Sequence, residues 1–354
     1  MFSVMKKTIF ILLLPFLLFG CSKKQTEAER QANIRPAPNL PFKITVVNTP
    51  EADEQKDIAD QAAVLINEKD YDKLEKMFAQ YRASKESYAD GTWKLMCAYD
   101  AIASPSDSAT WEGRQREIED WIQARPESVT ARIALARFLR EYAWEARGSG
   151  WASSVTDENW QLFGKRLNRA VDVLNDAKSL DEKCPIYWSA LLGVDLGLQV
   201  SKEEFTTVFK EAIQAEPDFS YYYRTRAVFL LPRWYGDEGE WERDLGQSAD
   251  RVGGEDGDML YAQVVWNIHH YGGSIDVFEG NKISWDRVDK GFAAILKRFP
   301  DSLAAKNERF HLAALAVDKE KARKYFLDTQ GQVDLSVWMA KNEFVDCANW
   351  SFAQ

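Results

Sequence analysis

Apolar residues recur with the period of an α-helix from about residue 51 onward, and this repeated pattern most constrains the fold. One stripe follows Ser201–Glu204, a segment with the form of a capping box. Its members are Phe205, Val208, Phe209, Ala212 and Ile213. Further stripes begin at Phe163 and at Trp285, whereas convincing strand alternation is absent from the sequence after residue 51. The pattern therefore predicts an all-α fold.

Short segments that contain proline separate these stripes, each between an amphipathic helix and a helix rich in alanine or aromatic residues. They are Ala124–Ser128, Ala215–Phe219, Arg298–Ser302 and Cys184–Ile186. Proline cannot continue a helix but fits the first turn of the next one, so each segment predicts a helix boundary. Pro185 and Pro217 are 32 residues apart, close to the 34 residues of a tetratricopeptide repeat, while the other spacings are uneven.

We therefore expect a right-handed α-solenoid of antiparallel helix pairs, tetratricopeptide-like with degenerate repeats, over residues 51–354. The expected pairs lie at 51–83, 92–124, 128–180, 185–215, 218–250, 255–299 and 301–330, with a terminal helix near 335–348. Each pair exposes apolar surface until a neighbouring pair covers it, which is the physical reason that such pairs stack.

The N-terminus has the features of an export signal. Lys6 and Lys7 precede an apolar run from Ile9 to Phe19, which is much shorter than the roughly 20 residues of a membrane-spanning helix. The run ends in Leu18–Cys21, and this segment resembles the lipobox of bacterial lipoproteins. We expect a signal peptide over residues 1–20 and a mature chain that begins with Cys21.

The lipoprotein resemblance implies that Cys21 carries several acyl chains, palmitate among them. Two or more chains convert marginal membrane partitioning into stable anchoring. Ser22 is not aspartate, which favours the outer membrane of a Gram-negative host, with the domain facing the periplasm. Residues 21–50 hold several prolines and little periodic apolar content, so we expect a flexible linker, although Phe42–Val47 could form a short strand.

Net charge, the spacing of cysteines and histidines, and the lack of catalytic motifs argue against several classes of function. A net charge of −10 argues against nucleic acid as a partner. Cys97, Cys184 and Cys347 lack the spacing of a metal site, and one disulfide among them or three buried thiols remain as alternatives. His269 and His270 are adjacent, so they point in different directions from a helix, and His311 is distant in sequence. We expect neither a metal nor a cofactor, and the sequence has no GxSxG, HExxH or P-loop pattern.

Five segments of the chain resemble a bacterial family known as domain of unknown function 4034. They are Tyr88–Leu95, Ser128–Arg132, Tyr142–Gly150, Leu231–Gly236 and Gly253–Asp258. The likeness extends over about residues 70–270. It implies a tetratricopeptide-type helical protein and brings no activity or catalytic residue with it.

Arginine and aromatic residues gather in and beside two of these segments, Tyr142–Gly150 and Leu231–Gly236, and they are the candidate ligand groove. Its members are Trp144, Glu145, Arg147, Trp151, Tyr222, Arg224, Arg226, Arg233, Trp234 and Tyr235. A guanidinium binds a carboxylate through two parallel hydrogen bonds, and aromatic rings supply contact area, so the groove suits an acidic peptide or a sugar. Alternatively, the rings fill gaps between helices and the arginines pair with the protein's own acids.

Two classes of function follow. The first is a membrane-anchored interaction module that binds a protein or peptide of the cell envelope. The second is a carbohydrate-active enzyme with an α/α-toroid, in which two inward carboxylates cleave a glycosidic bond. Because the sequence has no catalytic motif, we expect the interaction module.

Overall fold

The computed structural model describes residues 39–353, apart from 106–109, 151, 181–183, 272–274, 281 and 339. The chain divides into two compact units, and the larger one, Leu40–Phe352, contains all the elements below. The predicted signal peptide and Cys21 lie outside the described residues.

Fifteen α-helices follow one another in the described part of the chain, together with one 3₁₀ turn, η1 (Ala152–Ser154), and two short strands. The helices are α2 (Pro50–Asn67), α3 (Tyr71–Ser84), α4 (Lys94–Ala103), α5 (Trp111–Ala124), α6 (Val129–Arg147), α7 (Asp157–Lys178), α8 (Pro185–Leu198), α9 (Lys202–Ala215), α10 (Ser220–Phe229), α11 (Glu240–Val252), α12 (Gly254–His270), α13 (Trp285–Arg298), α14 (Leu303–Leu315), α15 (Lys319–Thr329) and α16 (Lys341–Phe352). Every expected pair is present and α16 is the terminal helix, so the predicted all-α solenoid is confirmed.

Local sequence signals set the ends of these helices. Ser201 completes its capping box with Glu204, and Ser128 and Thr156 accept hydrogen bonds from the first turns of α6 and α7. Pro185 occupies the first turn of α8, as predicted. At the other three boundaries the proline lies in the turn before the next helix, so its predicted position inside that helix is wrong.

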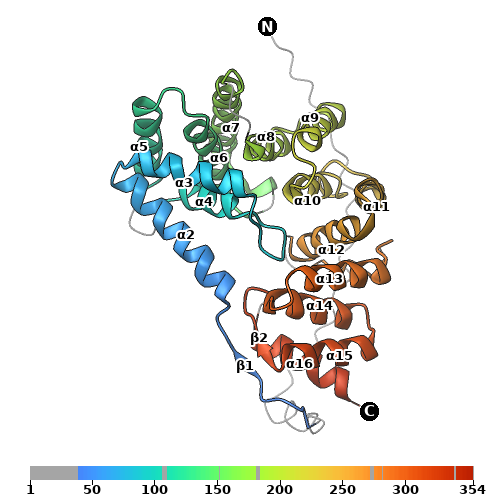
Figure 1. The fold of residues 1–354 in the computed structure, drawn as a ribbon. Helices are drawn as coiled ribbons and strands as arrows, with labels where there is room; N and C mark the ends of the chain where they lie inside the picture. Colours follow the sequence, from blue (N-terminus) through green and yellow to red (C-terminus); the bar gives the residue numbers. More distant parts are fainter. Residues whose placement is uncertain are drawn as a thin grey trace. The chain divides into compact units, whose positions relative to one another are not determined.

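From α4 to α12 the helices form an inner row with covering helices, and after α12 the helices α13, α14 and α15 stack in sequence order (Figure 1). The even-numbered helices α4, α6, α8, α10 and α12 each contact the next in this row, and the odd-numbered helices cover them. Burial follows the same division, because α6 buries twelve of its 19 residues and α7 only five of 22. The amphipathic stripes in the sequence therefore belong to the covering helices, while the inner helices are apolar on more than one face.

The start of the larger unit pairs with its C-terminal part. Strand β1 (Thr45–Val46) lies parallel to β2 (Gln332–Val333), and the backbone N–H of Val47 donates to the Val333 carbonyl at 3.1 Å. Leu40 and Ile44 also pack against the apolar cluster formed by α14, α15 and α16. Part of the segment expected to be linker therefore lies on the C-terminal helices.

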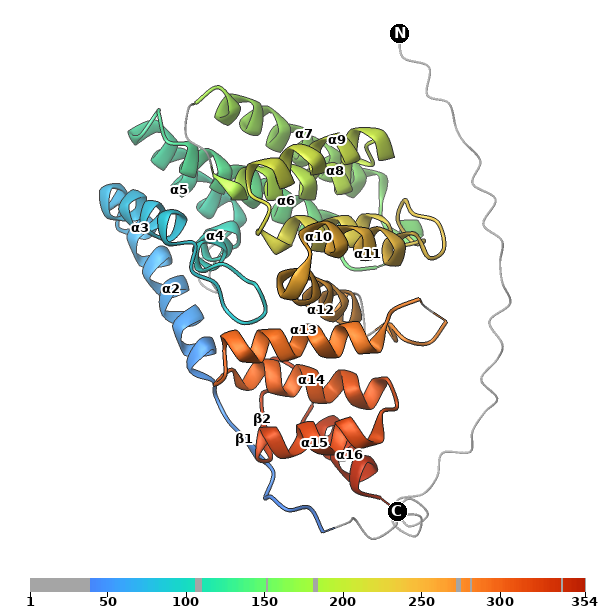
Figure 2. The ribbon, with the colours of Figure 1, turned by 45° about the vertical axis from the view of Figure 1, so that its right-hand side comes forward.

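The loop between α3 and α4 reaches across to helices that follow more than 120 residues later (Figure 2). Ser220 Oγ donates to the Gly91 carbonyl at 3.1 Å, and Gln263 Nε2 donates to the Ala89 carbonyl at 3.1 Å. Arg224 donates to the carbonyl of Asp90. These bonds tie the loop, which we call the 85–93 loop, to α10 and α12.

Candidate functional site

Arg147 lies at the C-terminal end of α6, where the helix stops at Gly148. Its Nη1 donates to the carbonyls of Gly148 and Gly150, at 2.9 and 2.8 Å. The guanidinium carbon lies 5.6 Å from the ring centroid of Trp144 and 5.8 Å from that of Trp160. The cation is therefore held beside two indole rings, where cation–π attraction favours it.

The loop after α10 brings Trp234 to the same place. The Trp144 and Trp234 rings meet edge to face with centroids 6.0 Å apart. Next to Trp234, Tyr235 donates its hydroxyl to the Leu196 carbonyl at 3.1 Å. Gly236 is required here, because a Cβ at this position would lie 1.8 Å from the carbonyl oxygen of Leu230.

A second arginine approaches from this loop. Arg233 Nη2 donates to the backbone carbonyl of Tyr271 at 3.1 Å, and its guanidinium carbon lies 4.6 Å from the Tyr271 ring centroid. Burial raises the pKa of the Tyr271 phenol, whereas a hydrogen bond with Trp234 and the charges of Arg233 and Arg147 lower it. The positive charges of two arginines from different parts of the chain therefore both favour the ionised form of the Tyr271 phenol.

We call these residues the aromatic–arginine cluster: Trp144, Arg147, Arg233, Trp234, Tyr235 and Tyr271. Within the described residues neither Arg147 nor Arg233 forms an ion pair, and their hydrogen bonds go to neutral carbonyls. In a chain with a net charge of −10, these two guanidiniums therefore keep their positive charge next to half-buried aromatic rings.

Three predicted groove residues lie elsewhere and already have partners. Tyr222 is completely buried, and its hydroxyl donates to the Pro185 carbonyl at 2.8 Å. Arg224 is bound to the 85–93 loop and lies over the Tyr221 ring. Arg226 forms ion pairs with Asp244. Their contacts hold α10 against α8, the 85–93 loop and α11, respectively.

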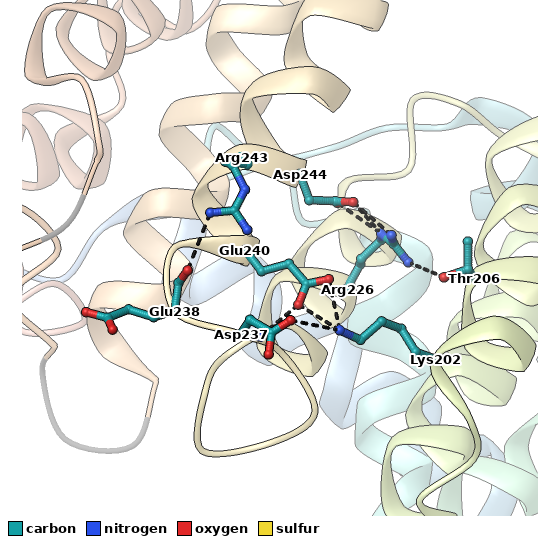
Figure 3. A network of polar contacts seen from close by, with 8 residues as sticks. All are labelled: Lys202, Thr206, Arg226, Asp237, Glu238, Glu240, Arg243 and Asp244. Atoms are coloured by element: carbon teal, nitrogen blue, oxygen red, sulfur yellow. Dashed lines mark hydrogen bonds and ion pairs between the residues drawn. The ribbon is translucent and has the colours of Figure 1, made fainter.

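Figure 3 shows the network that holds Arg226. Its Nε donates to both carboxylate oxygens of Asp244, at 3.0 and 2.9 Å, and its Nη1 donates to Thr206 Oγ1 at 3.1 Å. In the same network Lys202 Nζ donates to Glu240 Oε2 at 2.8 Å. These bonds join α9, α10 and α11, so Arg226 acts as a structural residue.

Two predicted groove residues remain, Glu145 and Trp151, which are near Arg147 in the sequence. Glu145 faces Arg166 of α7, with an N–O distance of 3.8 Å, and so has a partner of its own. Trp151 lies outside the described residues. Tyr271 belongs to the cluster but was not among the predicted groove residues. Its only local signal is an aromatic side chain just after the end of α12.

All three histidines of the chain meet, contrary to the expectation from their spacing. His269 Nε2 and His311 Nε2 are 3.3 Å apart, and the His270 and His311 ring centroids are 6.1 Å apart. His269 Nδ1 lies 2.7 Å from the Ile275 carbonyl, which makes this nitrogen the donor. Burial lowers the pKa of His311 to about 3. Among the described residues, no group of three metal-binding side chains has a geometry that could hold an ion.

Four carboxyl groups converge near the start of α2, but two of them have structural partners. They are Glu51, Asp90, Glu308 and Asp334. Asp90 accepts from the backbone N–H and hydroxyl of Thr92, and Asp334 accepts from Ser336 in the same way. Burial and the other three acids raise the pKa of Glu308 well above its ordinary value. The group therefore stabilises turns, and its buried member Glu308 gives up its proton less readily than an exposed glutamate.

Fold and site together describe an all-α helical-repeat protein in which two arginines without ion pairs among the described residues lie in one cluster with aromatic side chains. Residues 59–191 match the family model described as domain of unknown function (DUF4034), so the resemblance inferred from the sequence motifs is confirmed for this region. The motifs at 231–236 and 253–258 lie outside the matched residues. No curated protein and no solved structure matches the chain. In the described residues, no helix has the length and apolar character needed to cross a membrane.

Proposed function

We propose that this chain is a lipid-anchored interaction module of the bacterial envelope that binds an acidic peptide segment of a partner protein. The observation that supports it is the contact between the Trp144 ring, which lies beside Arg147, and the Trp234 ring, which follows Arg233 in the sequence, with no carboxylate paired to either arginine in the described residues. A carboxylate of the partner would accept parallel hydrogen bonds from a guanidinium.

The surroundings favour a peptide over a simple ion. Trp144 and Trp234 are half-buried and present aromatic surface beside the two cations. Arginine and tryptophan are the residues that most often dominate the energy of protein interfaces. The overall charge of −10 repels unspecific anions, so an acidic partner depends on this local patch.

Binding can be measured by fluorescence anisotropy with a labelled peptide that contains glutamates and one phenylalanine. The reference peptide has glutamine in place of each glutamate. Arg147→Gln and Arg233→Gln should each weaken binding of the acidic peptide by about tenfold, since a hydrogen bond to a charged group contributes about 1.5 kcal/mol or more. Arg116→Gln, at an exposed arginine outside the cluster, should leave binding unchanged.

Equal affinity for both peptides would contradict the proposal, and so would unchanged binding by the two cluster variants. Melting temperatures of all variants show whether a loss of binding reflects a loss of folding. Higher salt should weaken binding of the acidic peptide more than that of its glutamine reference.

The anchor is tested separately. Cys21→Ser should move the protein from the membrane fraction to the soluble periplasmic fraction, because only the cysteine thiol can carry the lipid. Cys97→Ser, at a half-buried cysteine of α4, should leave the distribution unchanged. If Cys21→Ser stays with the membrane, the chain is held there by something other than lipidation of this residue.

A further inference from the structure

We propose that a pocket beneath the 85–93 loop binds a neutral saccharide. The pocket has a volume of about 400 Å³ and lies apart from the aromatic–arginine cluster. Its walls come from the 85–93 loop, from the first turn of α10, from α12 and from the end of α13. A volume of this size falls at the lower end of the range for ligand sites and accommodates one or two sugar rings.

The pocket is formed in advance, because the loop that covers it is fixed at both sides. Within the loop, Tyr88 N donates to the Thr92 carbonyl at 2.8 Å, and Ser87 pairs with Trp93 as an antiparallel bridge. Outside it, the bonds from Ser220 and Gln263 hold the loop against α10 and α12. A rigid wall lowers the entropy cost of binding a small ligand.

Three of the four charged residues that line the pocket are held in ion pairs, and the fourth, Asp218, is exposed on the turn before α10, where its negative charge disfavours an anion. Lys85 pairs with Glu216 at 2.6 Å, and Arg298 pairs with Asp256 at 2.7 Å. A charged ligand would have to compete with these ion pairs, whereas a neutral ligand leaves them intact. The charge balance therefore favours a ligand without a net charge.

Inside the pocket, uncharged polar groups lack partners. The indole N–H of Trp93, a residue only 4% exposed, donates no hydrogen bond within the described residues. The Gln263 side chain uses its Nε2 on the loop, while its Oε1 accepts nothing from the described residues.

These groups match the chemistry of a sugar. A sugar hydroxyl donates and accepts at once, so one ligand can satisfy both the donor on Trp93 and the acceptor on Gln263. Met259 and Leu260 add apolar lining, against which the C–H face of a pyranose ring can pack.

The experiment uses the full-length chain and isothermal titration calorimetry. The probes are maltose, cellobiose, N-acetylglucosamine and its β-1,4-linked dimer, and the zwitterionic dipeptide glycyl-leucine. Ser87→Tyr fills the pocket from the loop side, and Asp218→Trp narrows it from the exposed turn before α10. Ser84→Tyr is the matched control, at an exposed serine that does not line the pocket.

We expect at least one of the four saccharides to bind at micromolar to millimolar concentration. Ser87→Tyr and Asp218→Trp should each weaken that binding at least tenfold, and Ser84→Tyr should not change it. The proposal is overturned if none of the saccharides binds at millimolar concentration, or if only glycyl-leucine binds. It is also overturned if both pocket variants fold and bind the saccharide as the wild type does.

Discussion

Acid should destabilise this protein through His311, and the size of the effect follows from the environment of the imidazole. Burial lowers the pKa of His311 from its ordinary 6.5 to about 3, and the neighbouring His269 and His270 act in the same direction. In the unfolded chain this pKa is about 6.5. Between pH 6.5 and pH 3 the unfolded state therefore binds a proton that the folded state does not, so stability falls as the pH falls through this window.

Each pH unit in this window corresponds to about 1.4 kcal/mol for one proton, which becomes about 2 kcal/mol between pH 6.5 and pH 4.5. The groups that face the imidazole are His269 and His270 on α12 and Glu343 on α16. The pKa of His269 is also lowered by burial and adds to the effect. Asp195 opposes it, because burial raises the pKa of that carboxyl to about 7.

A variant isolates the contribution of His311 from these other groups. His311→Phe keeps a ring at the position where the imidazole stacks on Trp338, with centroids 4.3 Å apart, but it cannot titrate. Urea unfolding, followed by circular dichroism, gives the free energy of unfolding of both proteins from pH 7.5 to pH 4.5. The variant should be less stable at pH 7.5, because it loses the contact with His269 Nε2.

On acidification from pH 6.5 to pH 4.5 the wild type should lose about 2 kcal/mol more than His311→Phe. The two curves therefore approach each other as the pH falls. Parallel curves over this range would show that His311 titrates near its ordinary pKa in the folded state, and the reasoning from burial would be refuted.

Three further predictions concern stability. Asp195→Asn should raise the free energy of unfolding at pH 7 by up to about 4 kcal/mol, because burial raises the pKa of this carboxyl to about 7 in the folded chain, whereas the unfolded chain ionises it near its ordinary pKa. Chemical unfolding at pH 4 should show a gain below about 1 kcal/mol, since the carboxyl is then largely protonated in the folded state and close to half protonated in the unfolded state. Gly91→Ala should lower the free energy of unfolding by about 1 to 3 kcal/mol, since φ is +78° and a Cβ would lie 2.8 Å from a side chain of α12. Gly246→Ala, in open space on α11, is the control and should be tolerated or stabilising; thermal melting of both variants checks the difference. Val47→Pro removes an N–H that donates to β2 and should lower the melting temperature more than Val46→Pro, whose N–H has no such bond; equal effects would argue against a role for this bond.

The helices could be predicted because their signals are local. A stripe of apolar residues, a serine or threonine at the N-cap and a proline in the following turn all lie within one or two helical turns of the boundary that they mark. The strands have weaker local signals: Phe42–Val47, which contains β1, was expected to be linker with a short strand as the alternative, and β2 was not predicted. Two residues of β1 are too few to show alternation, and they form a strand only because Gln332 and Val333 lie beside them.

The candidate site was predicted in part, since it depends on which residues of distant helices become neighbours. Trp144 and Arg147 were identified, and so were Arg233 and Trp234, but their meeting point at Tyr271 is set by the end of α12. The histidines show the same limit: His269 and His311 are 42 residues apart and become neighbours through the packing of α12 and α14. Sequence spacing describes one helix at a time and does not report such contacts.

Arg226 and Arg233 show why composition alone cannot distinguish a binding residue from a structural one. They are close in sequence and surrounded by the same aromatic residues. Arg226 lies within α10, facing α11, where Asp244 neutralises it through several hydrogen bonds. Arg233 follows the end of α10 and reaches only the Tyr271 carbonyl, which satisfies a donor without cancelling a charge. Arg226 is therefore neutralised within the chain whereas Arg233 keeps its charge, and for this reason the proposed function assigns the partner's carboxylate to Arg233 and not to Arg226.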